Sequence, residues 1–81
     1  MENMTNKQKL LDQFLQNPAS LPYKTIKTLL AAQGFVHIQA KGSHEKWKHP
    51  KLLRDLIIPI HNNDCKDFYK KDIASKIQTI L

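Results

Sequence analysis

The chain has 81 residues, enough for one domain with a modest core and too few for a deep, wholly enclosed active site. Thirteen Lys and Arg residues against seven Asp and Glu residues give a formal net charge of +6, which suits a polyphosphate partner or a solvated surface. The single cysteine, Cys65, excludes an intrachain disulfide. No apolar stretch is long enough to span a bilayer or resembles a signal segment, so we expect a cytoplasmic protein without membrane contact.

Two helices are predicted in the first 34 residues. Thr5 and Gln8 have the spacing of a capping box, and an apolar stripe that includes Phe14 follows at helical spacing over residues 5 to 16. Pro22 is well placed to open a second helix, because a proline at the first helical position loses no hydrogen bond. Gly34 stands where a left-handed residue usually ends a helix.

Three short strands are expected next. Residues 35 to 40 are rich in strand-forming side chains, Lys41-Gly42 can turn, and residues 43 to 49 form the second strand. The most apolar run, residues 52 to 60, contains the third strand, and Pro59 favours an edge position or a strand end. The short spacings favour an antiparallel meander.

A last helix is predicted from about Asp67 to the C-terminus. We expect its buried line to contain Tyr69, Ile73, Ile77 and Ile80 or Leu81, with Phe68 at the entry and Lys66, Lys70, Lys71 and Lys76 mostly elsewhere. The fold class is therefore α+β, a three-stranded antiparallel sheet with helices on one face. Its αβββα core has the order of double-stranded RNA-binding-like folds, preceded here by an extra helix.

The second predicted strand separates two kinds of side chain. Alternation places Trp47 on the face that meets the helices, as a core residue, and His44, Lys46 and Lys48 on the opposite face. An imidazole can move protons near neutral pH, and ammonium groups can hold a phosphate, so this row is a plausible site for a scissile RNA phosphodiester. A polar, solvent-facing strand side is the simpler interpretation of the same row.

Other chemistry is less well supported by the residues. No Ser-His-Asp arrangement includes Ser43, so a phosphate contact or a strand-end hydrogen bond suits it better than nucleophilic attack. The spacings of His44, His49, His61 and Cys65 match no familiar zinc pattern, and we expect neither a metal nor another cofactor. His61 follows the third strand and is a possible second proton-transfer group, although a surface role is more common for such a residue.

Several short motifs in order resemble the HicA family of bacterial toxins. They are Lys41-Gly42-Ser43-His44, the aromatic Trp47, His49-Pro50, Ile58-Pro59-Ile60-His61-Asn62 and the closing basic helix. The resemblance covers roughly residues 22 to 81. On this basis residues 1–20 are expected to form an N-terminal helical extension, and residues 21–81 a HicA-like ribonuclease domain.

The resemblance implies an activity and a partner. HicA proteins are endoribonucleases that cleave mRNA independently of the ribosome, arrest translation and are inhibited by a HicB antitoxin. It implies that His44 is the catalytic residue, and we expect Lys41, Gly42, Ser43, Lys46 and Lys48 to bind RNA. Glu45 stands where many members have a second histidine, and Lys46 where many have an apolar residue. The alternatives are an RNA-binding module without cleavage and, less well supported, a small DNA-binding regulator.

Overall fold

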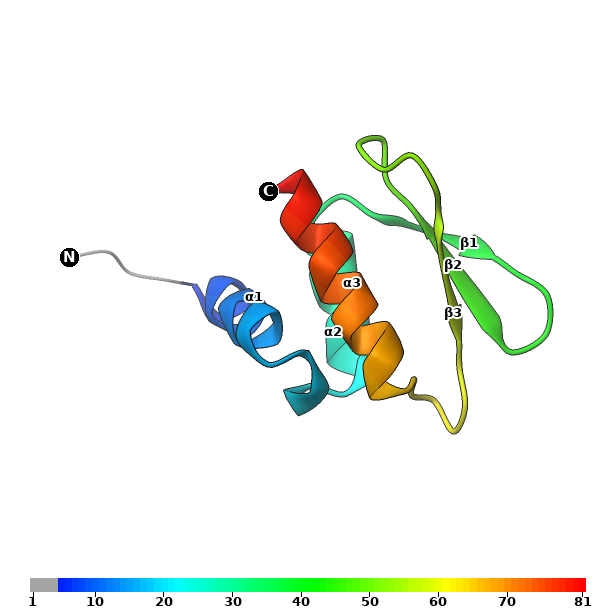
Figure 1. Ribbon diagram of the computed structural model, residues 1–81, viewed down its shortest axis with the longest axis horizontal. Coiled ribbons are helices and arrows are strands. Elements are labelled where there is room, and N and C mark those ends of the chain that lie inside the picture. Colours follow the sequence, from blue (N-terminus) through cyan, green and yellow to red (C-terminus); the bar gives the residue numbers. More distant parts are fainter. Residues whose placement is uncertain (1–4) are drawn as a thin grey trace.

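The computed structural model describes residues 5–81 and has the predicted order of elements (Figure 1). The elements are α1 (Asn6–Gln16), the short 3-10 helix η1 (Pro18–Ser20), α2 (Tyr23–Ala32), β1 (Val36–Gln39), β2 (His44–Lys48), β3 (Leu56–Pro59) and α3 (Asp67–Ile80). The first two strands are shorter than predicted, and β3 occupies only the later part of the apolar run of residues 52–60. The segment before β3 is mostly turn and bend instead of strand.

The sheet is an antiparallel meander with the order β1-β2-β3, as predicted. In the register of the sheet, His37 of β1 lies opposite Trp47 of β2, and Trp47 lies opposite Leu56 of β3. Figure 1 shows α2 and α3 on one side of the sheet, and α1 on the far side of these two helices. The fold class is thus the predicted α+β arrangement, and the described elements leave the other face of the sheet uncovered.

One core joins the helices to the inner face of the sheet. Its buried apolar residues are Phe14, Leu21, Tyr23, Ile26, Leu29, Leu30, Phe35, Trp47, Leu56, Ile58, Ile73, Ala74, Ile77 and Ile80. Phe14 has no exposed surface, so α1 packs into the same core as the rest of the described chain. The boundary between residues 20 and 21 stays a prediction, and residues 1–4 of that extension lie outside the described part.

Local chemistry sets the helix ends as predicted. The backbone N–H of Gln8 donates to Thr5 Oγ1 at 3.2 Å, and the Thr5 N–H donates to Gln8 Oε1 at 2.9 Å, which completes the capping box. Asn17, which precedes a proline, ends α1. Gly34 follows α2 with a φ of +91°, and a Cβ there would lie 3.3 Å from Nε2 of His49. Both conformation and space therefore favour glycine at position 34.

The predicted buried line of α3 needs one correction, at Lys70. Ile73, Ile77 and Ile80 are buried, so Ile80 and not Leu81 completes the line, and Phe68 at the helix entry is 73% exposed. Lys70, which we expected on the solvent side, is 5% exposed. The inner face of α3 extends past Tyr69, which is half-buried, and includes Lys70 because a carboxylate there pairs with its ammonium group.

Asp64 is that carboxylate, and it ties the starts of α2 and α3 together. Its Oδ1 accepts the backbone N–H of Tyr23 at 3.0 Å and that of Cys65 at 2.8 Å, and lies 3.3 Å from Nζ of Lys70. Burial alone would raise the pKa of the Asp64 carboxyl, but these donors outweigh it and hold the pKa below its usual value. Asp64 thus caps α2 from 41 residues away.

Replacing Asp64 tests this role. Asp64→Ala leaves the Tyr23 N–H and the buried Lys70 ammonium without their acceptor, so the free energy of unfolding should fall by about 1–3 kcal/mol in urea denaturation. The depressed pKa means that this stabilisation is present above about pH 4 and disappears as the pH falls through the folded-state value. The variant should therefore lose less stability than the parent on acidification.

Asp72→Ala is the matched control, since Asp72 pairs with Lys76 at 3.6 Å on the exposed side of α3. Removing that pair should cost less than about 0.5 kcal/mol. Equal losses from the two substitutions would show that Asp64 has no special role.

Candidate functional site

The side chains of β2 divide between the two faces of the sheet as predicted. Trp47 is 5% exposed and packs into the core, while His44 and Lys48 are exposed on the opposite face. Lys46 lies on that outer face too, and its Nζ is 3.5 Å from Oδ2 of Asp55. Part of the positive charge of the row is therefore balanced, and among residues 5–81 Lys48 carries no ion pair.

His44 begins β2 at the end of a tight hairpin. Its N–H donates to the carbonyl of Lys41 at 3.3 Å, and Gly42 has a φ of +63° with open space where a Cβ would stand. The carbonyl of Ser43 accepts the N–H of Ile60 at 2.8 Å, which fixes the hairpin to the end of β3. The backbone of His44 is thus anchored at a corner of the sheet, and its side chain is exposed there.

A hollow of about 370 Å³, here called the hairpin hollow, lies at this corner. It is bordered by Gly42, Ser43 and His44, by Asn62 and Asn63 after β3, and by His37 and Glu45 from the sheet. Three predicted site residues therefore border one concave surface. Lys41 is exposed on the same hairpin, and the Lys46–Lys48 row continues from His44 along the outer face.

His61 borders a different hollow from His44. Its backbone forms a bridge with Asp64, and Asn62 and Asn63 between them have φ values of +52° and +62°. After this turn of the backbone, His61 borders a hollow of about 300 Å³ that Tyr69 also lines. Cys65 lies in that hollow as well, and burial raises the pKa of its thiol to about 11, so it stays protonated at neutral pH.

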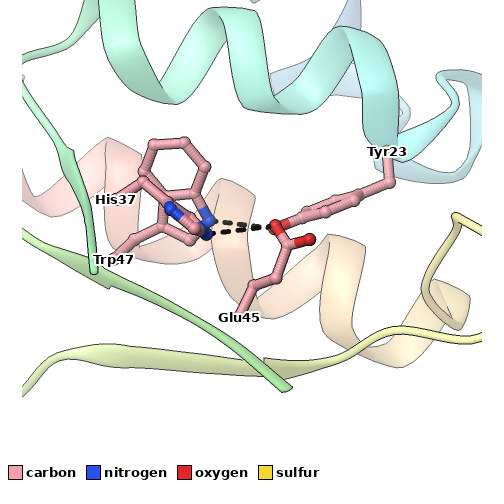
Figure 2. Close-up of polar contacts among 4 residues, drawn as sticks. All are labelled: Tyr23, His37, Glu45 and Trp47. Carbon is pink, nitrogen blue, oxygen red and sulfur yellow. Dashed lines mark hydrogen bonds and ion pairs between the residues drawn. The ribbon is translucent and has the colours of Figure 1, made fainter. Parts of the chain in front are cut away.

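Three side chains on the inner face of the sheet and Tyr23 of α2 form a connected polar network (Figure 2). Trp47 Nε1 donates to the hydroxyl of Tyr23 at 2.9 Å, and that hydroxyl donates to Oε1 of Glu45 at 2.9 Å. His37 Nε2 lies 3.5 Å from the same carboxylate oxygen, and its ring packs edge-on against Trp47 with centroids 5.0 Å apart. Burial raises the pKa of Tyr23 far above its usual value, so its hydroxyl stays protonated and donates to Glu45.

His37 is the residue that sequence reasoning missed. It is exposed, and it contacts Glu45 and Trp47 and borders the hairpin hollow. The register that brings His37 opposite Trp47 depends on how β1 pairs with β2, which the sequence does not reveal. The alternation of side chains along each strand did indicate which residues share a face. His37 and Gln39 share a face of β1, as Glu45 and Trp47 share a face of β2.

No group of three or more His, Cys, Asp or Glu residues within residues 5–81 is placed to hold a metal ion. No helix in the same part of the chain is long and apolar enough to cross a membrane. His49, one of the four histidines, is buried, and both of its ring nitrogens are engaged. Nε2 lies 2.9 Å from the carbonyl of Gln33, and Nδ1 accepts the N–H of Lys51.

Comparison with protein families identifies the region that carries this site. The family model described as the HicA toxin of bacterial toxin-antitoxin systems matches residues 23–78, more than half of the chain. The chain belongs to the HicA toxin family. Searches of curated proteins and of solved structures found no match. The hairpin, His44, the sheet and nearly all of α3 lie inside the matched region, whereas α1 lies outside it.

Glu45 is the residue at which the sequence departs from the pattern that the HicA resemblance suggests. Its side chain, at the position where many HicA proteins have a second histidine, turns to the inner face and contacts Tyr23 and His37. His44 is on the outer face of the same strand. The imidazole that faces Glu45 in this HicA protein is therefore His37 of the neighbouring strand.

Replacing the Tyr23 hydroxyl tests the network. In Tyr23→Phe the buried Trp47 N–H loses its acceptor, so the free energy of unfolding should fall by about 1–3 kcal/mol in urea denaturation. Tyr69→Phe is the control, because the Tyr69 hydroxyl forms no hydrogen bond within residues 5–81. Equal stability of the Tyr23→Phe variant and the parent would contradict the proposed importance of these bonds.

Proposed function

We propose that this HicA family member is a toxin that acts as a metal-independent endoribonuclease on mRNA, with His44 as the general acid or base. The observation that carries the proposal is the position of His44, exposed on an anchored hairpin at the start of a strand whose outer face continues with Lys46 and Lys48. This hairpin lies within the region matched by the HicA family model.

The chemistry asked of the site is simple because RNA supplies its own nucleophile. An enzyme needs to take the proton of the 2′-hydroxyl, stabilise the charge on the phosphorus oxygens and protonate the departing 5′-oxygen. His44 would perform one of the proton transfers. Lys41, Lys46 and Lys48 would hold phosphates, and the backbone at Gly42 and Ser43 would let the chain of the RNA approach closely.

Two histidines are candidates for the second proton transfer. His61 is the group predicted from the sequence, but it borders a separate hollow from that of His44. His37 borders the hairpin hollow together with His44 and has a carboxylate partner in Glu45. We therefore propose His37 and His61 as rival candidates for the second proton transfer, with a water molecule as the third.

A non-catalytic RNA-binding module is the alternative function. It is favoured by the position of His61, which borders a different hollow from His44, since a mechanism with these two histidines needs both groups at one phosphate. Such a module would bind RNA with a strong dependence on salt and leave it intact.

Incubating the purified protein with labelled single-stranded RNA separates the two functions. The parent should cut the RNA, and His44→Ala should reduce the cleavage rate by about a hundredfold or more, because general acid–base catalysis contributes about that much. His37→Ala and His61→Ala compared in the same gel show which one supplies the second transfer. Undiminished cleavage by a folded His44→Ala variant would refute the catalytic role, and intact RNA with the parent would favour the alternative.

Inhibition by an antitoxin suggests a second use for the outer face of the sheet. Val36 and Ile57 are 61% and 57% exposed there, beside Lys48 and Lys46 respectively. An acidic HicB-type partner that covers this mixed apolar and basic face would also cover His44 and speed its own encounter by charge complementarity.

A charge reversal on the face tests this mode of inhibition. Lys48→Glu should weaken the complex with the antitoxin by about tenfold or more at low salt, mainly through slower association in surface plasmon resonance. Lys71→Glu, at an exposed position on α3, makes the same change of charge away from the face and should have a much smaller effect. Equal effects of both substitutions would argue for a different binding surface.

A further inference from the structure

A third concave surface lies on the helical side of the protein, away from the Lys46–Lys48 row. It is a groove of about 640 Å³ between α1, α2 and the sheet. Lys7 of α1, Lys24 and Lys27 of α2, and His37 and Glu45 of the sheet border it, and we call it the lysine groove. Three lysines from two helices thus border one recess.

The charge of the lysine groove is largely uncompensated within residues 5–81. Lys7 and Lys24 are exposed, and none of the three lysines pairs with a carboxylate in this part of the chain. Lys27 places Nζ 5.5 Å from the ring centroid of Tyr23. The acidic side chain at the groove, Glu45, already accepts the Tyr23 hydroxyl and faces His37. Such a surface attracts an anion of several charges.

The lysine groove and the hairpin hollow are neighbours, because His37 and Glu45 border both of them. The lysines on the helices and the hairpin residues Ser43 and His44 therefore lie on either side of this shared pair. A ligand that occupies the hairpin hollow and has further phosphates in a chain would reach the lysines without leaving the surface. A flat membrane surface would meet the rims of the recess before its floor.

We propose that the lysine groove binds the phosphodiester backbone of single-stranded RNA on one side of the bond that is cut. This inference rests on the proposed function. It assigns an RNA-binding role to Lys7, Lys24 and Lys27, which the catalytic proposal does not use. It also gives α1 a role, because Lys7 lies outside the residues matched by the family model and extends the RNA-binding path beyond the family domain.

The experiment measures RNA binding without cleavage. In a His44→Ala background, fluorescence anisotropy with labelled single-stranded RNA is recorded over a range of salt concentrations. Each phosphate that a lysine no longer neutralises should reduce the slope of log K against log salt by about 0.7 for a single strand. Replacing Lys7, Lys24 and Lys27 by Gln should therefore lower the slope by about 2 and weaken binding more than tenfold at low salt.

A matched variant controls for net charge. Lys66, Lys71 and Lys76 on or beside α3 line neither the lysine groove nor the hairpin hollow, and their replacement by Gln removes the same charge. It should change the slope by much less. A further variant with Lys7→Gln and Lys24→Gln only keeps the contact of Lys27 with Tyr23, and its slope should still fall by about 1.4.

The outcomes separate this inference from the proposed function. A smaller slope confined to the groove variants supports it. An unchanged slope in those variants, or an equal fall in the α3 control, overturns it, whether or not the protein with His44 intact cuts RNA. Intact RNA in that separate assay would contradict the endonuclease activity while leaving the groove to be judged by its own binding slopes.

Discussion

The alternation of side chains along β2 is the constraint on which the rest of the structure depends. β2 is the central strand and is paired on both sides, so its register cannot slip by one residue without exposing Trp47 and burying charged side chains. Trp47 packs among the helices, and its indole N–H meets the Tyr23 hydroxyl. The same alternation directs His44 and the lysines of β2 to the outer face. The core and the proposed catalytic row are therefore two consequences of one strand.

Tyr23 and Asp64 connect this strand to the helices. The backbone N–H of Tyr23 donates to Asp64, and its hydroxyl bridges Trp47 and Glu45. The start of α2 is thus bound to the turn before α3 and to the middle of the sheet. Because Glu45 is committed to this network, it does not act as a carboxylate partner of His44. A change at Glu45 would therefore affect the support of the sheet and the position of His37.

Features that depend on neighbours in the sequence could be predicted, and features that depend on distant contacts could not. The Thr5 capping box, the left-handed Gly34 and the burial of Trp47 follow from local spacing and alternation. The burial of Lys70 depends on Asp64, which no periodicity of α3 reveals.

The candidate site divides in the same way. The exposed position of His44 and its row of lysines could be predicted from one strand. The position of His61 at a different hollow could not, because it depends on two left-handed asparagines and a bridge between His61 and Asp64. The approach of His37 to Glu45 required the register of β1 on β2. The order of the motifs, by contrast, sufficed to predict the HicA family membership.

The chemical identity of the cut ends tests the central claim most directly. The parent protein is incubated in EDTA with a labelled RNA and with the same RNA lacking the 2′-hydroxyl at the nucleotide before the cut. If His44 promotes attack by the 2′-hydroxyl, the first RNA is cut to leave a 2′,3′-cyclic phosphate and the second is not cut at that position. Cleavage at the modified position, or a 3′-hydroxyl at the newly formed end of the upstream fragment, would contradict this account.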